Sequence, residues 1–434
     1  MWDFRTDPEF QSKLDWVDDF VRQECEPLDL LFPHIGQPYN PENEAARAIL
    51  RPLQQQVQEQ GLWACHLPPE LGGGGYGQVK LALLNEILGR SQWAPTVFGT
   101  AAPDTGNAEI LAMFGTAEQK ARYLQPLLDG EIVSCFSMTE PQAGADPKEF
   151  VCSARPDGDD WVINGQKWFS SNARYASFFI VMAVTDPGAP PYRQMSMFVV
   201  PAETPGITIL RNVCVMPDRE ELDEGTHAYI EYRDVRLPAD AMLGGVGEGF
   251  AVAQARLGGG RVHHAMRTVG VCRRAFDMMA ERVLSRRTQG ELLADKQLVQ
   301  QFIADSWIEL QQFRLLVLHT AWVIDNEPHG AARTDIAMCK VAMAKVMHDI
   351  IGRAIQIHGS LGVSTETPLH NWWAMAPALA LADGPTEVHK TTIAKRILKG
   401  YRPAPGIFPT EHIPTRRDTA RERYADVLAE HGVS

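Results

Sequence analysis

The spacing of apolar residues changes twice along this chain of 434 residues, and this order limits the folds that the chain can adopt. From Pro8 to about Gly130, apolar residues recur every three or four positions, as in amphipathic helices. Residues 131–247 hold short β-rich runs between turns, and long amphipathic helical segments return after Phe250. We therefore predict a mainly α fold with a central β-domain. Its four parts are an N-terminal α-helical domain (1–130), a middle antiparallel β-domain (131–247), a C-terminal four-helix bundle (248–400) and a tail (401–434). The four helices of the bundle are expected at about 248–285, 294–325, 333–358 and 386–399.

The composition is that of a folded globular protein, with 45% hydrophobic and 22% charged residues. A formal net charge of −13 argues against nucleic acid or an anionic membrane as the main partner. The seven cysteines are scattered without a C-x-x-C pair, so we expect no disulfide framework, no zinc cluster and a cytoplasmic location. The chain has no H-E-x-x-H motif, no secretory signal pattern and no long apolar run, so we expect no metal site and no membrane span.

A carboxylate stands at an expected break between two helices near the C-terminus. An apolar helical stretch stops at residues 380–382, Asp383-Gly384-Pro385 follows, and a basic helix continues to Lys399. Such a break frees backbone N–H groups and can aim a side chain into a cleft, which suits a catalytic base. Taken alone, the same three residues are better explained as a turn.

Two segments of the β-domain have the composition of a site for a flat cofactor. A strand expected at 132–138 runs into the turn 139–146, where proline and glycine expose backbone amides. The segment 164–172 then supplies Trp168, whose ring can cover a cofactor face, and Ser170, whose hydroxyl can bond its edge. By itself this second segment is also explained by a β-hairpin with a core tryptophan.

Together with three further motifs, these segments resemble the acyl-CoA dehydrogenase family over about residues 8–400. The motifs are, in chain order, T-E-P-x-A-G-x-D from Thr139, N-G-x-K-W-F-S-S from Asn164, R-R-T-Q-G from Arg286, Q-I-H-G-S-L-G from Gln356 and A-D-G-P-T-E-V from Ala382. The resemblance implies an N-terminal helical domain, a middle antiparallel β-barrel domain and a C-terminal four-helix bundle. It also implies FAD in a cleft between the β-domain and the bundle.

The resemblance implies roles for individual residues. Met138 and Thr139 would hold the pyrimidine edge of the flavin, while Trp168 would flank the ring system and Ser170 would bond near N5. The resemblance also implies that Arg286 lies on the pyrophosphate of the FAD of a partner subunit, a role that suits a guanidinium, whose N–H groups match phosphate oxygens. The protein is therefore expected to be a homodimer or homotetramer. The other candidates for the cofactor site are Phe136, Thr288, Gln297, Gln356, Gly359, Ser360, Pro385 and Glu387. As an alternative, Arg286 could simply form a cation pair with Arg287 at a helix C-terminus.

The base motif departs from the commonest family pattern, Y-E-G-T. With Ala382-Asp383-Gly384-Pro385 in its place, Asp383 would be the base, one methylene shorter than glutamate. This form resembles a subgroup that uses aspartate, some members of which carry a fused kinase-like domain and act on 4-hydroxyacyl-CoA. Pro385 replaces a threonine that contacts flavin. Ala145 replaces a serine that contacts CoA.

Four residues are candidates for substrate binding: Asp104, Ala145, Arg261 and Gly384. Asp104 and Asn107 bring polarity to a region that lies near the acyl pocket in the family, which suggests a hydroxylated or otherwise polar acyl chain. Alternatively, Asp104 is the N-cap of a helix from Ala108. Arg261 would lie near the thioester end of the site, or be a surface salt-bridge residue.

The function that the resemblance implies is FAD-dependent dehydrogenation of an acyl-CoA thioester to the trans-2-enoyl-CoA. Asp383 would remove the α-proton while the β-hydrogen leaves as hydride to flavin N5, and an electron-transfer flavoprotein would accept the electrons. Three alternatives remain: an acyl-CoA oxidase, a nitroalkane-type oxidase, and a DNA-binding alkylation-response homologue without enzymatic activity. The acidic net charge disfavours the last of these.

Overall fold

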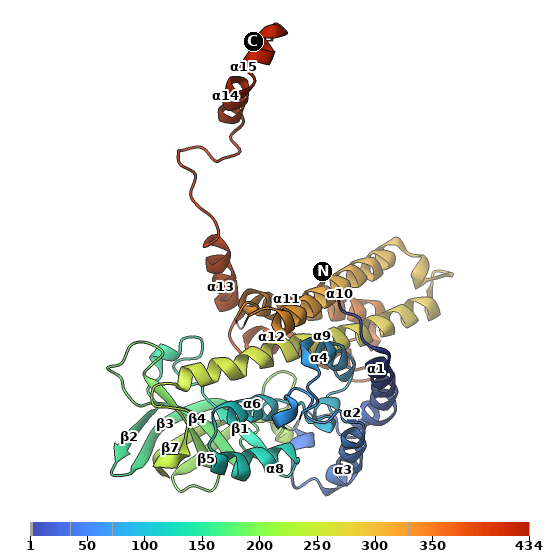
Figure 1. Cartoon of the computed structure of the whole chain (residues 1–434). Coiled ribbons are helices and arrows are strands. Elements are labelled where there is room, and N and C mark those ends of the chain that lie inside the picture. Colours follow the sequence, from blue (N-terminus) through green and yellow to red (C-terminus); the bar gives the residue numbers. More distant parts are fainter. Residues whose placement is uncertain (1–2, 35, 72, 329, 434) are drawn as a thin grey trace. The chain divides into compact units, whose positions relative to one another are not determined.

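The computed structural model describes residues 3–34, 36–71, 73–328 and 330–433. These residues form two compact units, one ending at Lys390 and the other beginning at Thr391. Each unit is described by itself, and Figure 1 shows the elements of both, coloured along the chain.

The N-terminal part of the larger unit is α-helical, as predicted. Its two longest helices begin where the sequence supplies caps: the Asp7 carboxylate accepts the N–H of Phe10 at 2.8 Å, and the Asn43 side chain accepts the N–H of Ala46 at 3.0 Å. The apolar stripe that begins at Phe10 is buried. The helices of this part are α1 (Pro8–Phe20), α2 (Glu26–Leu31), α3 (Glu44–Glu59), α4 (Gly77–Leu88), α5 (Ala94–Val97), α6 (Asp104–Phe114), α7 (Ala117–Gln119) and α8 (Gln125–Leu128).

The middle part forms one sheet. Its strands follow the order β6-β7-β3-β2-β4-β5-β8, and β1 pairs with β4. The strand bounds are β1 (Ser134–Ser137), β2 (Ser153–Asp157), β3 (Asp160–Ser171), β4 (Phe178–Val184), β5 (Met195–Pro201), β6 (Ile207–Val213), β7 (His227–Pro238) and β8 (Met242–Leu243). Most pairs are antiparallel, as expected from turns that join successive strands.

The prediction of an antiparallel domain holds for most pairs and needs one correction, because β4 pairs in parallel with β1 and with β2. No turn joins β1 to β4; the chain forms the β2–β3 hairpin between them, and turn residues say nothing about such non-local pairs. The sheet curls around one interior core, since the rings of Trp161 on β3 and Phe198 on β5 lie 5.6 Å apart although these strands are not neighbours. Its other face packs on α6 and α8.

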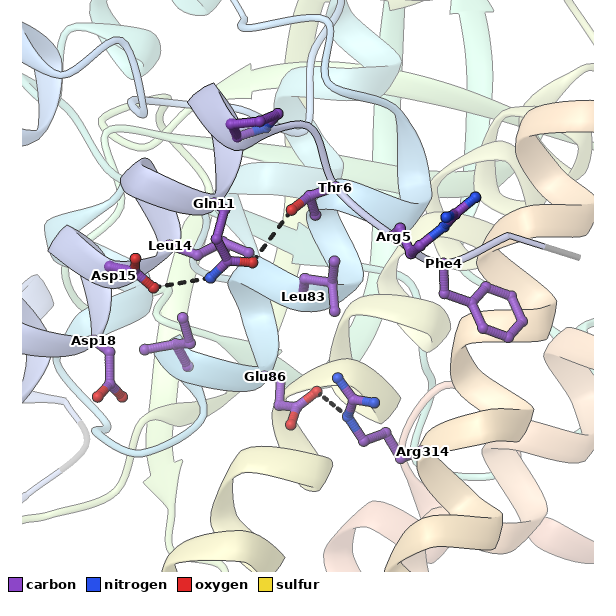
Figure 2. A pocket seen from close by; sticks show the side chains of 12 residues that line it. Phe4, Arg5, Thr6, Gln11, Leu14, Asp15, Asp18, Leu83, Glu86 and Arg314 are labelled. Carbon is purple, nitrogen blue, oxygen red and sulfur yellow. Dashed lines mark hydrogen bonds and ion pairs between the residues drawn. The ribbon is translucent and has the colours of Figure 1, made fainter.

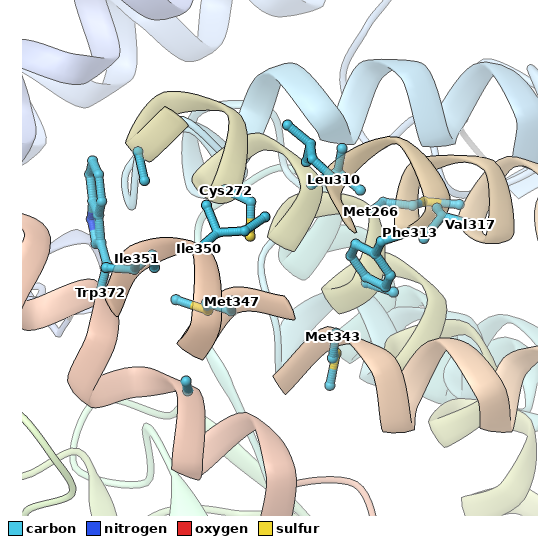
Figure 3. Packing of buried hydrophobic residues seen from close by; sticks show 14 of the residues in the cluster. Met266, Cys272, Leu310, Phe313, Val317, Met343, Met347, Ile350, Ile351 and Trp372 are labelled. Carbon is cyan, nitrogen blue, oxygen red and sulfur yellow. The ribbon is translucent and has the colours of Figure 1, made fainter. Parts of the chain in front are cut away.

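Helices return after the sheet, with α9 (Gly249–Ser285), α10 (Gln297–Asn326), α11 (Arg333–His358), α12 (Leu369–Leu381) and α13 (Thr386–Leu398). A short hairpin of β9 (Arg287–Thr288) and β10 (Glu291–Leu292) links α9 to α10. Figure 3 shows the core that these helices share, with Met266, Phe313, Met347 and Trp372 from four of them. The fourth helix of this core is the apolar α12 rather than the expected helix at 386–399, because α13 buries only His389 among its described residues.

The long helix α9 runs from the sheet to the other C-terminal helices (Figure 1) and contributes to a hydrophobic core at each of these two places. Val252 and Ala253 near its start pack with β-domain residues, whereas Val262 and the residues after it pack with α10 and α11. The segment 254–261 of α9 therefore lies where the sheet and the helical core meet. No helix in the described parts of the chain is both long and apolar enough to cross a membrane.

The smaller unit begins within α13 and contains α14 (Ile413–Arg423) and α15 (Ala425–Glu430). Most of the residues between and within these helices are exposed.

Candidate active site

The predicted break between two helices is present. The last backbone hydrogen bond of α12 runs from Ala382 N–H to Ala378, and α13 starts at Thr386. Between them, Asp383 and Gly384 both adopt positive φ angles, of 56° and 103°. Gly384 is required here, because a Cβ at this position would lie 2.9 Å from Nε2 of His389. The N–H of Asp383 has no hydrogen-bond partner among the residues that the structure describes.

Side chains from three helices hold the break in place. The Nε–H of Arg261 on α9 donates to the carbonyl of Asp383 at 2.9 Å, and Nε2 of His389 lies 3.3 Å from the same oxygen. The fully buried Lys340 on α11 donates its ammonium to the carbonyl of Leu379 at the end of α12. Burial lowers the pKa of Lys340 to about 8, and nearby Asp383 opposes this shift. Arg261 is thus not a surface salt-bridge residue.

The carboxylate of Asp383 faces α9. Its Oδ2 lies 3.9 Å from Nε2 of His264, and a Cβ on Gly260 would lie 3.7 Å from the same oxygen. The Asp383 side chain keeps 21% of its surface exposed, so that it is accessible from solvent. Burial, assisted by Arg267, lowers the pKa of His264 to about 4, and its imidazole is therefore neutral at neutral pH.

A polar network lies one turn earlier on α9. The guanidinium of Arg256 stacks 4.0 Å from the centre of the Phe136 ring, and its Nε–H donates to the side-chain oxygen of Asn107 at 2.9 Å. Gly106 leaves the space for this arginine, since a Cβ there would lie 2.8 Å from Arg256 Cγ. Burial lowers the pKa of Arg256, and Asp383 opposes this shift.

Asp104 is not the N-cap of α6. The helix begins at Asp104 itself, after Pro103, and the carboxylate accepts both the backbone N–H (2.8 Å) and the hydroxyl (2.6 Å) of Ser134 on β1. Asn107 donates to the same hydroxyl at 2.8 Å. Asp104 therefore ties α6 to the first strand and supports the asparagine that holds Arg256.

Sequence analysis did not identify Glu109, which is the third charged group of this region after Arg256 and Asp104. A Cβ on Gly259 of α9 would lie 3.0 Å from both carboxylate oxygens of Glu109. The Glu109 side chain therefore occupies the space that a side chain at position 259 would need. Burial raises the pKa of Glu109 to about 8, against the influence of Arg256. The signal in the sequence was a charged residue on the otherwise apolar stretch 108–112.

The two predicted cofactor segments are joined by a buried ion pair. Lys167 Nζ lies 2.7 Å from the Glu140 carboxylate, with both side chains at most 1% exposed, and it also donates to the carbonyl of Met138 at 2.8 Å. Glu140 further accepts the backbone N–H groups of Val151 and Cys152. The backbone N–H of Trp168 donates to the carbonyl of Thr139 at 3.0 Å. The lysine and the glutamate of the two motifs thus explain why the motifs occur together.

Part of this surface has the donors and the aromatic face that a flavin needs. Trp168 is half-buried, with the rings of Phe169 and Tyr229 at 4.8 and 6.2 Å, and Phe169 is 41% exposed. The hydroxyl of Thr139 has no hydrogen-bond partner in the described part of the chain. Ser170 does not fit its expected role, because its hydroxyl is fully buried and bonds to Ser137 at 2.9 Å.

The remaining predicted cofactor residues lie on the surface of the larger unit. They flank the β9–β10 hairpin or follow the end of α11, and all are exposed: Arg286, Thr288, Gln297, Gln356, Gly359 and Ser360. Arg286 caps the C-terminus of α9, so the alternative reading as a helix-terminal cation also fits its position. Ala145 and Glu387 are exposed, and Pro385 is half-buried in the break.

Figure 2 shows a separate groove of about 820 Å³ between α1, α4 and α10. Its lining includes the ion pair between Glu86 and Arg314, with 2.7 Å between Oε2 and Nε. None of the residues predicted to carry chemistry lines this groove. Among the described residues, no group of three or more potential metal ligands occurs.

Comparison with known proteins gives matches over most of the chain. Family models for the N-terminal, middle and C-terminal domains of acyl-CoA dehydrogenases match residues 8–131, 135–220 and 247–398. "Probable acyl-CoA dehydrogenase FadE2" of Mycobacterium tuberculosis is 42% identical over 383 residues, which cover 87% of this chain and 93% of that protein. "Acyl-CoA dehydrogenase family member 10" of Mus musculus is 42% identical over 359 residues, 81% of this chain but only 33% of the mouse protein. A solved structure of a putative acyl-CoA dehydrogenase from Mycobacterium abscessus is 39% identical, with a TM-score of 0.83 over 92% of this chain and all of the other.

Proposed function

The chain belongs to the acyl-CoA dehydrogenase family, whose enzymes use FAD to dehydrogenate acyl-CoA thioesters, and we propose that here Asp383 is the base that removes the α-proton. The product would be the trans-2-enoyl-CoA. The single observation that carries this proposal is the helix break, which presents a half-buried carboxylate next to the backbone N–H of the same residue, without a partner among the described residues.

The chain's own groups divide the work at the α-carbon. A thioester carbonyl acidifies its α-hydrogen, and a carboxylate such as that of Asp383 can accept the proton. Negative charge then develops on the thioester oxygen, and the N–H of Asp383 can donate to it. FAD, when bound, supplies the acceptor for the β-hydride. Arg261 and His389 hold the carbonyl of Asp383, so that its N–H and its carboxylate keep a fixed relation.

Residues of the β-domain would hold the cofactor. We assign the pyrimidine edge to Met138 and Thr139 and the ring face to Trp168, and we leave the buried Ser170 out of the direct contacts. Its hydroxyl, with those of Ser137 and Tyr232, instead stabilises the end of β3 behind the tryptophan. The exposed residues around Arg286 would complete the FAD site of a second subunit in a homodimer or homotetramer.

The expected partners follow from this assignment. An electron-transfer flavoprotein would reoxidise the enzyme, and the substrate would be an acyl-CoA. We propose a cytoplasmic location, which the free state of all seven cysteines supports.

The test is flavin bleaching by acyl-CoA under anaerobic conditions in a stopped-flow instrument. Asp383→Asn is expected to bind FAD normally and to lose at least ~100-fold in bleaching rate, the lower end for a general base. Glu387→Gln and Glu109→Gln address the competing carboxylates. Wild-type bleaching by Asp383→Asn, combined with an inert Glu387→Gln or Glu109→Gln, would move the role of base to that residue. Rapid peroxide formation in air would indicate an oxidase instead.

A further inference from the structure

Helix α9 presents one stripe of residues toward the helix break. Arg256, Gly260 and His264 are four positions apart, and residues at this spacing lie on the same face of an α-helix. Gly260 and His264 both approach the same atom, Oδ2 of Asp383. A Cβ on Gly260 would make only an ordinary contact with this oxygen, whereas the histidine, one turn later, supplies a polar nitrogen beside it.

His264 is the described basic side chain that reaches the Asp383 carboxylate. Its Nε2 lies 3.9 Å from Oδ2, and no other lysine, arginine or histidine nitrogen in the described ranges lies within 4.0 Å of either carboxylate oxygen. Arg261 bonds the backbone carbonyl of Asp383 instead, and Lys340 bonds that of Leu379. A distance of 3.9 Å exceeds a hydrogen bond, but such contacts in ligand-free sites often shorten when substrate binds.

Burial, together with the surrounding charges, lowers the pKa of His264 and keeps its imidazole neutral. Basic groups act on it from its own helix and from α11, and they disfavour a second positive charge: Arg256, Arg267 and Lys340. Its neighbour His263 is also held neutral by burial, and among the described acidic groups Asp383 is the one that favours protonation of His264. A neutral donor can orient a carboxylate, whereas an adjacent cation would stabilise its ionised form strongly and make it a weaker base.

We propose that His264 is a positioning residue for the base, donating its Nε2–H to Oδ2 of Asp383 and leaving Oδ1 to take the α-proton. The inference rests on the proposed function of Asp383. It also gives a reason for the histidine on this stripe: an aspartate is one methylene shorter than a glutamate, so its carboxylate stays closer to its own backbone, and a donor from α9 fixes its rotation.

The experiment compares His264→Gln, which keeps an N–H donor, with His264→Leu, which has a similar size but no donor. Both FAD-loaded variants are mixed anaerobically with acyl-CoA across a pH series. We expect the flavin of His264→Leu to bleach at least about 10-fold more slowly, the scale of a hydrogen bond to a charged group. In the plot of bleaching rate against pH, the acid limb should move to higher pH. The bleaching rate of His264→Gln should stay within about 3-fold of that of the wild type, and its acid limb should lie at the wild-type pH.

A second measurement isolates proton removal. A 3-thia-acyl-CoA has an acidic α-hydrogen and no β-hydrogen to transfer, so the long-wavelength absorbance of its complex with the oxidised enzyme reports deprotonation alone. The pH at which this band appears should rise in His264→Leu and return in His264→Gln. His348→Leu, which removes an exposed imidazole from α11, is the matched control and should behave as the wild type.

Several outcomes would overturn the inference. Equal rates and unchanged pH limbs in His264→Leu and His264→Gln would show that donation from His264 has no role. If His264→Leu does not fold, His264→Asn replaces it, because its amide is too short to reach Oδ2; an Asn variant as active as the Gln variant then contradicts the role of His264 in the same way. Asp383→Asn is run alongside: a wild-type rate there contradicts the proposed function itself, whereas an inert Asp383→Asn with a normal His264→Leu contradicts only the role of His264.

Discussion

At the scale of single residues, Asp383 holds a conformation that its side chain disfavours. A non-glycine residue with φ of 56° costs on the order of 1 kcal/mol or more, and such strain persists only where surrounding contacts enforce it. Two bonds to the Asp383 carbonyl, from Arg261 and His389, supply this enforcement. The strain directs the carboxylate toward α9 rather than along the helix, where a residue with ordinary helical angles would place it.

Glu109 gives a prediction about pH that does not depend on catalysis. Its pKa rises by burial from 4.5 to about 8, so the folded chain binds this proton more tightly than the unfolded chain. Stability should therefore fall as pH rises from about 4.5 to 8, by up to ~1.4 kcal/mol per pH unit for one group. Glu109→Gln has no such proton to lose. The unfolding free energy of this variant, relative to that of the wild type, should therefore increase as pH rises over this range. Urea unfolding at several pH values measures the difference, and parallel curves for the two proteins would contradict it.

The sequence identified some of these residues and missed others for a physical reason. Asp383 was identified because the glycine and proline that follow it favour a turn, which is a local backbone conformation. Arg256, Glu109 and His264 were missed because long-range packing creates their roles: Arg256 meets Asn107 across 149 positions of the chain. At Asp104 the alternative interpretation as an N-cap was wrong, because the carboxylate bonds Ser134 on β1; its role in substrate binding stays a prediction.

At the scale of elements, the turn after β1 and the strand β3 depend on one buried ion pair. Lys167→Met would leave the Glu140 carboxylate buried without its cation, and breaking one side of such a pair costs about 3–5 kcal/mol. We expect a large loss of unfolding free energy in urea and a loss of FAD, because Met138, Thr139 and Trp168 surround the pair.

The control for this prediction is an exposed pair on α11. Lys345→Met removes the partner of Asp349, with the lysine side chain 75% exposed, and should change stability by no more than ~0.5 kcal/mol. Equal effects of the two substitutions would mean that the buried pair has no special weight. Neither effect was foreseen from the sequence: the motifs suggested cofactor contacts through Thr139 and Ser170, and gave no indication that glutamate and lysine hold the two segments together.

Helix α9 shows how an element can serve a site at a cost to itself. Three successive glycines, Gly258 to Gly260, lie inside the helix, where each costs roughly 1 kcal/mol relative to alanine. Two of them face carboxylates, Gly259 that of Glu109 and Gly260 that of Asp383. The packing of the flanking turns on both cores offsets this weakness, which explains why the helix continues through the glycines.

At the scale of the whole molecule, the order of helical, β and helical parts was predictable because hydrophobic periodicity is a local property of each segment. The two parallel strand pairs, and the use of α12 in the helical core, were not predictable, since they depend on which distant segments meet. The same limit applies to assembly. Exposed residues around Arg286 matched the family motifs, but a single chain does not bring them to Asp383.

The final prediction asks whether one subunit completes the site of another. Arg286→Ala alone should lose FAD affinity, by ~1.5–3 kcal/mol for a hydrogen bond to a charged group, and Asp383→Asn alone should bind FAD without bleaching. A hybrid dimer purified with two different tags combines the two variants. If Arg286 acts on the partner's FAD, one site of the hybrid contains an intact Asp383 together with an intact Arg286, and anaerobic bleaching by acyl-CoA returns in that site. If Arg286 acts within its own chain, every site of the hybrid lacks one of the two residues, and at an FAD concentration too low to load Arg286→Ala the hybrid bleaches no better than its parents. A monomer in sedimentation with normal FAD binding would also rule out the shared site.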